Sequence, residues 1–364
     1  MIGRALAALV AALLAAPACG QDYHREDLRI PMREAGAAGL EAMLLRPDAP
    51  GRYPLVLLSH GAPRDGRDRA KMTATSQYPV AMEFARRGFA VAVVMRRGYG
   101  NSGGGFAENR RGCSDPDYIT PAKASVRDLK AAIHALAERP DIDGHRIVAV
   151  GQSAGGMATV GLAADPPAGL IAAISFAGGR GSRADFDVCR ADQLVQAFRT
   201  FGKTARIPML WVYTANDHFF DPPLADRLYA AFTGAGGHAD YVHAPAFGKD
   251  GHQLFSSAGI PYWTPYVDAF LAKHRLTQRA APMDMPPLPD LKPPPQLSAR
   301  GREAFHQFLR AGPHKAFAVN PTGYFGWRSG RHNAKDAADG ALQFCRAAGA
   351  KDCRVVFTDD TAAN

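Results

Sequence analysis

Seven prolines lie between Thr277 and Leu297, in the stretch TQRAAPMDMPPLPDLKPPPQL. Each proline fixes its own φ angle and lacks the backbone N–H that helices and sheets require, so we expect a semi-rigid linker over 277–297. This linker divides the 364-residue chain into two unequal parts. We therefore predict a large domain over 24–276 and a small module over 298–364.

The large domain alternates short apolar runs with segments of helical periodicity. We expect strands at 54–59, 89–95, 146–150, 170–176, 208–213 and 241–243, and helices at 80–87, 121–138, 154–164, 224–232 and 262–274. Such apolar strands are covered on both faces, and their alternation with helices is typical of a doubly wound, mostly parallel sheet. The predicted fold class is therefore α/β. Residues 179–206 interrupt the alternation, and with an expected helix at 191–201 they are a candidate lid.

The strand expected at 146–150 is followed directly by Gly151-Gln-Ser-Ala-Gly-Gly156. A serine at a tight turn between a strand and a helix is held in a strained backbone, and its hydroxyl is exposed above the sheet edge. Small residues at Gly151 and Gly155 let the chain pass close by, and the helix N-terminus supplies free N–H groups. The motif predicts that Ser153 is a nucleophile, and the alternative is a purely structural turn serine.

A serine hydroxyl needs a base that removes its proton, and the base needs an acid that fixes its tautomer. Asp217 follows the expected strand at 208–213, and His252 lies in a glycine-rich loop after the last expected strand. The order Ser153, Asp217, His252 matches a hydrolase pattern of nucleophile, acid and histidine. The alternatives that the sequence leaves open are Asp221 and Asp250 for the acid, and His218 and His243 for the base.

Acyl transfer also needs N–H donors for the oxyanion that develops on the carbonyl oxygen. The backbone N–H of Ala154, directly after the predicted nucleophile, is one expected donor. The second should come from the loop after 54–59, which reads His60-Gly-Ala-Pro63. Proline has no N–H, which leaves Ala62 as the candidate. The alternative is that this loop merely ends the strand.

Gly98-Tyr-Gly-Asn-Ser-Gly103 satisfies the GxGxxG pattern of dinucleotide-binding proteins but lacks its context. The residues up to Cys113 are polar and glycine-rich rather than helical, and no strand-ending acidic residue follows about 20 residues later. We therefore predict a loop beside the site and no cofactor. Arg96 and Arg97, at the end of the preceding strand, are either partners in buried ion pairs or contacts for a substrate carboxylate.

Composition excludes two further classes of protein. The net charge of +9 is spread along the chain, and no run of five or more Lys or Arg occurs, so we expect no nucleic-acid partner. The cysteines are not accompanied by a CxxC or HxxxH pattern, so we expect no metal site.

The start of the chain, MIGRALAALVAALLAAPACG, has the anatomy of a secretory signal peptide. Arg4 precedes an apolar run over 5–16 that is too short to span a bilayer, and Ala16-Pro-Ala18 resembles a cleavage site. Removal of 1–18 would expose Cys19, the position that a bacterial lipoprotein acylates. We predict an exported protein, periplasmic or secreted, with membrane contact only if Cys19 is lipidated. The alternative is a buried N-terminal helix.

Apart from Cys19, the chain has four cysteines, an even number that indicates disulfides in an exported protein. Cys345 and Cys353 lie close together in one small region, and we expect them to pair. Cys113 and Cys189 then remain for a second disulfide. The alternative is four buried free thiols.

Between about 29 and 275 the chain resembles the α/β-hydrolases, and is most similar to their dienelactone-hydrolase-like and prolyl-oligopeptidase-like groups. The resemblance rests on HGAP at 60–63, RRGYGNSG at 96–103, GQSAGG at 151–156, Asp217, and GKDGH at 248–252. It implies a serine hydrolase that uses Ser153, Asp217 and His252 in the usual roles.

Two departures from these groups bear on the substrate. Dienelactone hydrolases have a cysteine where Ser153 stands, so lactone specificity does not carry over. Prolyl peptidases add a propeller for which this chain has no room, and no tyrosine follows His60-Gly61 as an extra oxyanion donor. We therefore expect hydrolysis of carboxylic esters, with a small ester or short peptide as substrate. The alternatives are a serine peptidase or amidase of the prolyl-oligopeptidase type, and a non-catalytic envelope-binding protein.

The small module resembles disulfide-clipped modules of exported bacterial proteins, through FGW at 325–327, ALQFC at 341–345 and CRVVF at 353–357. Its pattern predicts an α+β unit with one helix at 334–348 packed on short strands. Tyr324 and Trp327 are either core residues or a ligand-binding face, and contact with an envelope or cell-wall polymer is a hypothesis for the module.

Overall fold

A computed structural model describes residues 23–347 and 349–363. The large domain contains one eight-stranded sheet in the order β1-β2-β4-β3-β5-β6-β9-β10. Its strands are β1 (Tyr23–Ile30), β2 (Leu40–Pro47), β3 (Tyr53–Ser59), β4 (Ala90–Val94), β5 (Ile142–Gln152), β6 (Leu170–Phe176), β9 (Met209–Thr214) and β10 (Asp240–Ala244). From β4 to β10 all neighbours pair in parallel, and β2 runs antiparallel to both β1 and β4. The expected mostly parallel sheet is confirmed.

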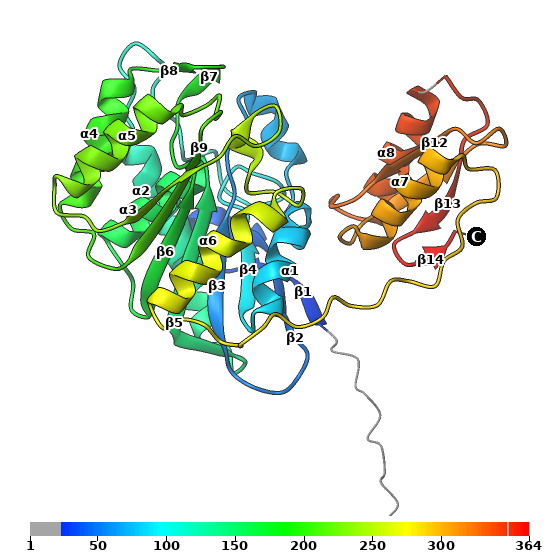
Figure 1. Ribbon diagram of the computed structural model, residues 1–364, viewed down its shortest axis with the longest axis horizontal. Coiled ribbons are helices and arrows are strands. Elements are labelled where there is room, and N and C mark those ends of the chain that lie inside the picture. The colour runs from blue at the N-terminus through cyan, green and yellow to red at the C-terminus, as the bar shows by residue number, and fades with distance from the viewer. Residues whose placement is uncertain (1–22, 348, 364) are drawn as a thin grey trace, which may run out of the picture.

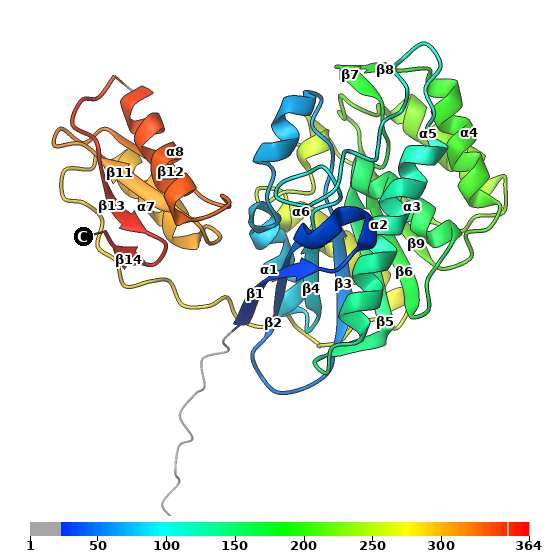
Figure 2. The ribbon, with the colours of Figure 1, turned by 180° about the vertical axis from the view of Figure 1, so that it is seen from behind.

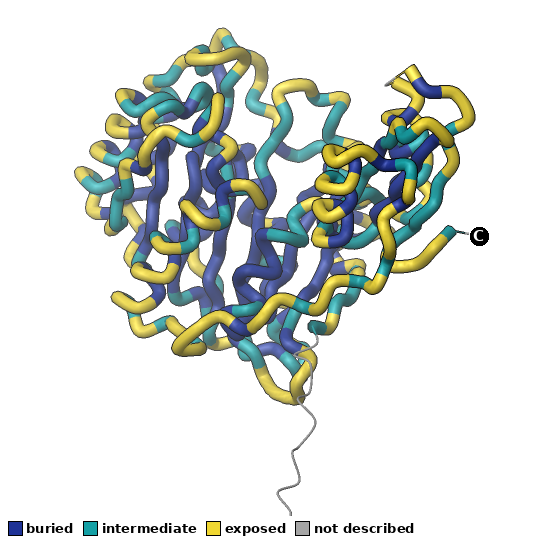
Figure 3. The backbone as a smooth tube through the Cα atoms, turned by 45° about the vertical axis from the view of Figure 1, so that its right-hand side comes forward, coloured by how far each residue is buried: buried dark blue, intermediate teal, exposed yellow. Residues whose placement is uncertain are grey.

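Helices cover both faces of this sheet (Figures 1 and 2). One face carries α1 (Tyr78–Arg86) and α6 (Ile260–Lys273), and the other carries α2 (Ile119–Ala137), α3 (Ala154–Ala164), α4 (Ala191–Gly202) and α5 (Pro222–Thr233). Each face has its own apolar core, with Trp263 fully buried on the first and Trp211 on the second. Figure 3 shows the strands buried between these layers. The doubly wound arrangement is therefore confirmed.

Two strands at the N-terminal edge of the sheet, β1 and β2, were not expected. β1 has the sequence YHREDLRI, and Ile30 is its one fully buried residue, because the strand lies at the sheet edge. Such a strand lacks the continuous apolar run that marks the buried parallel strands. Short 3₁₀ helices complete the connections: η1 (Arg33–Ala38), η2 (Gly66–Lys71), η3 (Ala74–Gln77) and η4 (Gly251–Gln253).

The C-terminal module is an α+β unit with its own sheet, in the order β12-β11-β13-β14. Its elements are α7 (Ala299–Arg310), β11 (Ala316–Val319), β12 (Phe325–Arg328), α8 (Ala334–Ala347), β13 (Arg354–Thr358) and β14 (Thr361–Ala362). The expectation of one helix was wrong, because α7 packs Phe305 and Phe308 on one face of the sheet while α8 packs Ala337 and Ala341 on the other. Trp327 packs against the α7 side, whereas Tyr324 is half exposed.

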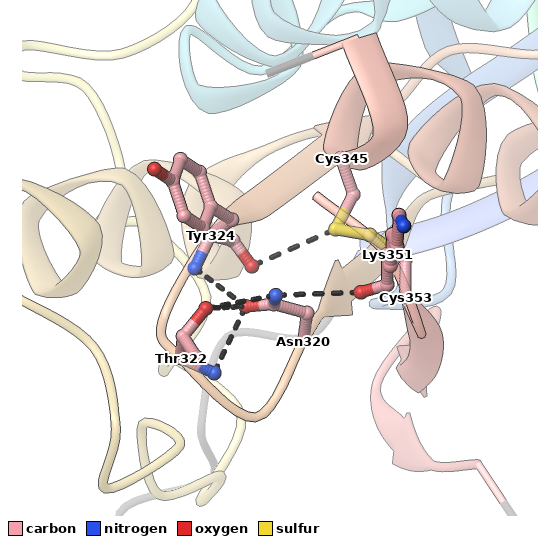
Figure 4. The surroundings of a disulfide bond; sticks show 6 residues. All are labelled: Asn320, Thr322, Tyr324, Cys345, Lys351 and Cys353. Atoms are coloured by element: carbon pink, nitrogen blue, oxygen red, sulfur yellow. Dashed lines mark hydrogen bonds between the residues drawn. A yellow bond between two sulfur atoms is a disulfide. The ribbon is translucent and has the colours of Figure 1, made fainter. Parts of the chain in front are cut away.

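A disulfide between Cys345 and Cys353 joins the end of α8 to the start of β13 (Figure 4). Asn320 lies beside it and ties the β11–β12 turn to the disulfide loop: its Nδ2 donates to the Lys351 carbonyl at 3.3 Å, and its Oδ1 accepts from Tyr324 N–H at 2.9 Å. The module thus has a covalent and a polar clamp at the same end.

The proline-rich stretch contains no helix or strand over 277–297. Part of it nevertheless packs on the large domain, because Met283 N–H donates to the Arg86 carbonyl at 2.8 Å. The module also touches the domain directly: Thr73 Oγ1 donates to the Gly330 carbonyl at 2.5 Å, and His332 Nε2 lies 2.9 Å from the Ala70 carbonyl. The module therefore contacts the η2–η3 segment.

None of the described helices is both long and apolar enough to cross a membrane. The expected signal peptide over 1–18, and Cys19, lie outside the described residues.

Candidate active site

Ser153 occupies the turn between β5 and α3 with a positive φ, at φ 56° and ψ −120°. Its neighbours have no room for a side chain. A Cβ on Gly151 would lie 2.2 Å from the Gly155 carbonyl oxygen, and a Cβ on Gly155 would lie 2.0 Å from the Ser59 carbonyl oxygen. Glycine is therefore required at both positions, and the strained turn presents Ser153 at the end of its strand, as a nucleophile elbow does.

His252 and Asp217 form a buried hydrogen-bonded pair, with 3.1 Å between His252 Nδ1 and Asp217 Oδ2. The same carboxylate accepts the backbone N–H groups of Phe219 at 2.7 Å and Phe220 at 2.9 Å. Because a carboxylate only accepts, His252 Nδ1 carries the proton in this bond, and the lone pair lies on Nε2. Such an imidazole is prepared to act as a base.

The alternative acids and bases have other contacts. Asp221 accepts from Leu224 N–H at the start of α5, and Asp250 accepts the backbone N–H groups of His218 and His252. The His218 ring lies 3.1 Å from Asp185, at the protein surface. The fourth alternative, His243, has an exposed side chain. No second Asp–His pair buried like that of Asp217 and His252 occurs in the described chain.

Gln152, the residue before Ser153, connects this turn to the loop of His252, because its Nε2 donates to the His252 carbonyl at 2.6 Å. None of the hydrogen bonds formed by the described residues joins Ser153 Oγ to the His252 ring. A second link is Phe219, which stacks on the His252 ring and lines the same cavity as Ser153.

Both expected oxyanion donors, Ala62 and Ala154, line the cavity at Ser153. The loop of Ala62 is fixed by His60, whose Nε2 accepts Arg96 N–H at 3.1 Å and whose Nδ1 donates to the Gly61 carbonyl at 2.6 Å. Burial and the charge of Arg96 hold the pKa of His60 well below its usual value. His60 is therefore neutral, and it shapes the loop rather than acting as a base.

Arg96 and Arg97 are both partners in buried ion pairs, with Glu108 at 2.5 Å and Asp128 at 2.7 Å. The sequence had left a direct contact with substrate open for these two arginines. Arg96 also donates to the His60 carbonyl at 2.7 Å, so it holds the loop that carries Ala62.

Sequence reasoning missed Glu108 and Arg180. Burial opposes ionisation of Glu108, but Arg180 and Arg96 together hold the pKa of its carboxyl well below the usual value. Arg180 Nη1 lies 2.7 Å from Glu108, and its Nη2 donates to Ser125 Oγ at 2.7 Å. The only signal for this network in the sequence is the group of arginines between 96 and 111, together with Arg180.

The cavity at Ser153 has a volume of about 270 Å³. Residues 179–183 form one of its walls, and they lead into a hairpin of β7 (Ser182–Ala184) and β8 (Asp187–Val188), which helix α4 follows. A disulfide between Cys113 and Cys189 fastens this segment to the opposite loop. The segment considered as a lid thus does border the site. The described residues hold no group of three or more His, Cys, Asp or Glu placed to bind a metal ion.

The sequence of residues 36–206 matches the family described as X-Pro dipeptidyl-peptidase (S15 family). No curated protein sequence matches the chain.

Several solved structures are similar in fold. A Bacteroides ovatus protein described as a dipeptidyl aminopeptidase IV is 15% identical with a TM-score of 0.51, over 69% of this chain and 36% of that one. A Klebsiella pneumoniae protein described as a dienelactone hydrolase is 17% identical with a TM-score of 0.48, over 68% of this chain and 98% of that one. The Pyrococcus furiosus esterase Pf2001 is 14% identical with a TM-score of 0.46, over 70% and 90%.

The strand–turn–helix unit at Ser153 is the arrangement of the nucleophile elbow in α/β-hydrolases. The chain has the α/β-hydrolase fold, and it is a hydrolase of the esterase and peptidase type.

Proposed function

We propose that the protein is an exported serine hydrolase that cleaves carboxylic esters through an acyl-enzyme. The observation that carries the proposal is the combination of Ser153, at a positive φ in the cavity wall, with a buried His252–Asp217 pair whose imidazole stacks on Phe219 of the same cavity. Strained serines and buried Asp–His pairs are each costly to maintain, and their joint presence at one sheet edge is what acyl transfer requires.

In the proposed reaction, Ser153 Oγ attacks the ester carbonyl while His252 Nε2 takes its proton. Asp217 holds the imidazole in the required tautomer and stabilises the imidazolium that forms. The backbone N–H groups of Ala62 and Ala154 bind the oxyanion. Collapse of the tetrahedral intermediate breaks the ester C–O bond, and His252 gives its proton to the departing alcohol. Water, activated by the same imidazole, then hydrolyses the acyl-enzyme and restores Ser153.

The family match makes a peptidase the second candidate, and the charge of the cavity argues against one form of it. A dipeptidyl-peptidase acts on chains with a free amino terminus, which is a cation. Glu108 is the one carboxylate among the residues that line the cavity, and it is already paired with Arg96 and Arg180. A free amino group would therefore meet arginines, whereas an ester needs no cationic terminus.

The proposal of export rests on two observations. The described chain contains two disulfides, Cys113–Cys189 and Cys345–Cys353, and such bonds persist in oxidising compartments. The sequence over 1–18 has the composition of a signal peptide. Detection of the mature protein in the periplasmic or culture fraction, with a new N-terminus after residue 18, tests this part of the proposal.

Labelling by a fluorophosphonate tests the chemistry directly. We expect the wild type to be labelled and to hydrolyse 4-nitrophenyl acetate, and we expect Ser153→Ala to lose both properties, with kcat reduced by about 10⁶-fold. Ser257→Ala, at an exposed serine, is the matched control and should keep both. Equal labelling of wild type and Ser153→Ala would reject Ser153 as the nucleophile, and a folded wild type that is neither labelled nor active would favour a non-catalytic role.

A further inference from the structure

The cavity beside Ser153 is strongly cationic. Its lining includes five arginines and one carboxylate: Arg64, Arg69, Arg110, Arg180, Arg183 and Glu108. A concave site lined by one sign of charge concentrates ligands of the opposite sign. The charge of the cavity lining therefore indicates which class of substrate the site binds.

Three of the five arginines form ion pairs with carboxylates of the protein. Arg180 pairs with Glu108 at 2.7 Å. Arg64 pairs with Asp185 at 2.9 Å, and Arg183 pairs with Asp187 at 2.8 Å. These ion pairs hold the wall in place, and each of the three guanidinium groups already has a carboxylate partner.

Arg69 and Arg110 have no carboxylate within ion-pair distance in the part of the chain that the structure describes. The Arg69 guanidinium lies over the Phe106 ring, 3.9 Å from its centroid. Arg110 Nη2 lies 3.6 Å from Cys189 Sγ, and Arg110 Nε is buried without a hydrogen-bond partner. A buried guanidinium N–H without an acceptor is costly, and an anion in the cavity would satisfy it.

Both arginines are held by contacts outside the cavity. Arg69 belongs to η2, where the neighbouring Ala70 carbonyl contacts His332 of the C-terminal module. Arg110 lies in the loop that the Cys113–Cys189 disulfide fastens, and its own carbonyl accepts Asp117 N–H at 2.8 Å. These contacts fix the backbone at both arginines before any ligand arrives, which lowers the entropic cost of binding.

We propose that Arg69 and Arg110 bind an anionic group of the substrate, and that the enzyme therefore prefers small esters that carry a carboxylate. This inference rests on the proposed ester hydrolysis at Ser153. Guanidinium groups match the planar geometry of a carboxylate. The rings of Phe106 and Phe219 line the same cavity and suit an apolar or aromatic portion between the two ends of the substrate. The volume of about 270 Å³ restricts it to a small molecule.

Three acetate esters with matched leaving groups test the preference. They are (4-acetoxyphenyl)acetate, its neutral amide (4-acetoxyphenyl)acetamide, and the cationic 4-acetoxybenzyltrimethylammonium. We expect kcat/KM of the wild type for the anion to exceed that for the amide by at least about tenfold, and the cation to be the poorest substrate. An equal rate for all three esters, or a preference for the neutral or cationic ester, would overturn the proposal.

Substitutions test whether Arg69 and Arg110 cause the preference for the anionic ester. In Arg110→Gln and in Arg69→Gln, we expect the anion-to-amide ratio of kcat/KM to fall about tenfold, and Arg110→Lys should restore part of it. Arg33→Gln, at a side chain that is 93% exposed, is the control and should keep the wild-type ratio. Thermal melting verifies that each variant is folded. A wild-type ratio in both folded glutamine variants would overturn the assignment.

A binding measurement tests the anion site independently of the proposed ester hydrolysis. (4-Hydroxyphenyl)acetate is titrated calorimetrically into Ser153→Ala, with and without Arg110→Gln. Binding that the second substitution weakens about tenfold supports the anion site whether or not the wild type hydrolyses esters. Absence of binding to Ser153→Ala, or equal binding to both variants, would overturn the anion site even if ester hydrolysis is established.

Discussion

The ring of Phe219 lies face to face with the imidazole of His252, with 3.9 Å between the ring centroids and 8° between the planes. Arg64 lies over the same phenyl ring, 3.7 Å from its centroid. The backbone N–H of Phe219 also donates to Asp217 Oδ1 at 2.7 Å. One residue thus contacts both members of the buried pair, and its side chain limits how far the imidazole can turn.

We expect Phe219→Ala to lower kcat for 4-nitrophenyl acetate by about 10- to 100-fold, because a catalytic group that is free to move by about 1 Å loses alignment. The backbone donor to Asp217 remains in this variant. Phe186→Ala is the matched control, because that ring is 64% exposed and it contacts His218 instead. Equal kcat values for the two variants would show that the stacking does not position His252.

Asp217→Asn tests the tautomer of His252. An amide can donate to Nδ1, which would place the imidazole proton on Nε2 and leave no base facing Ser153. We expect kcat to fall by about 10⁴-fold while the fold persists, as judged by circular dichroism. Asp221→Asn is the control, because asparagine also caps a helix N-terminus and Asp221 accepts from Leu224 N–H. A similar loss in both variants would contradict the assignment of the acid.

Gly155→Ala tests the packing of the turn. The added Cβ would lie 2.0 Å from the Ser59 carbonyl oxygen, which belongs to the backbone and cannot move aside without shifting β3. We expect the free energy of unfolding in urea to fall by about 3 kcal/mol or more. Gly105→Ala is the matched control, because nothing lies within 4 Å of its Cβ position, and it should leave stability unchanged. A stable Gly155→Ala would mean that the turn relaxes.

The elements that the sequence predicted well are those whose pattern is local. Runs such as 170–176 match buried parallel strands, and the GQSAGG motif identified the turn that the structure has at Ser153. In these segments propensity, burial and turn chemistry all favour the same structure. The sequence predicted Asp217 as the acid and kept Asp250 as an alternative, and in the structure the His252 ring contacts Asp217 whereas Asp250 accepts the His252 backbone N–H.

The parts that the sequence did not predict depend on distant contacts. β1 is stabilised by pairing with β2 rather than by its own apolar content. Helix α7 has a recognisable signal that was overlooked: Ser298 caps it by accepting Gly301 N–H, and its apolar residues follow at 305, 308 and 309. The buried Glu108–Arg180 contact joins residues 72 apart, and spacing alone gives no reason to pair them.

The two disulfides should stabilise the chain by different amounts. They enclose segments with sequence separations of 76 and 8, and restriction of the unfolded chain grows with the length of the closed loop. We expect the double variant Cys113→Ser/Cys189→Ser to lose about 4.5 kcal/mol and Cys345→Ser/Cys353→Ser about 2.5 kcal/mol. Chemical unfolding under oxidising conditions, followed by fluorescence, measures both. A larger loss in the second variant would contradict this expectation.

The neutral, buried His60 predicts a specific dependence of stability on pH. Burial and the charge of Arg96 lower the pKa of His60 well below 6.5 in the folded protein, whereas the unfolded chain binds a proton near pH 6.5. Above that pH neither state is protonated, so His60 contributes no slope. Below it only the unfolded state takes up the proton, and the free energy of unfolding therefore falls as the pH falls.

We expect His60 to contribute a slope that approaches about 1.4 kcal/mol per pH unit below pH 6. His60→Gln keeps one donor and one acceptor in the side chain but does not titrate, so its stability curve between pH 7 and 5 should be flatter than that of the wild type. His24→Gln, at an exposed residue, is the control and should keep the wild-type slope. Urea unfolding at a series of pH values measures all three. Equal slopes for His60→Gln and the wild type would mean that His60 has the same protonation state in the folded and unfolded chains. The loop that carries Ala62 would then not depend on a neutral imidazole.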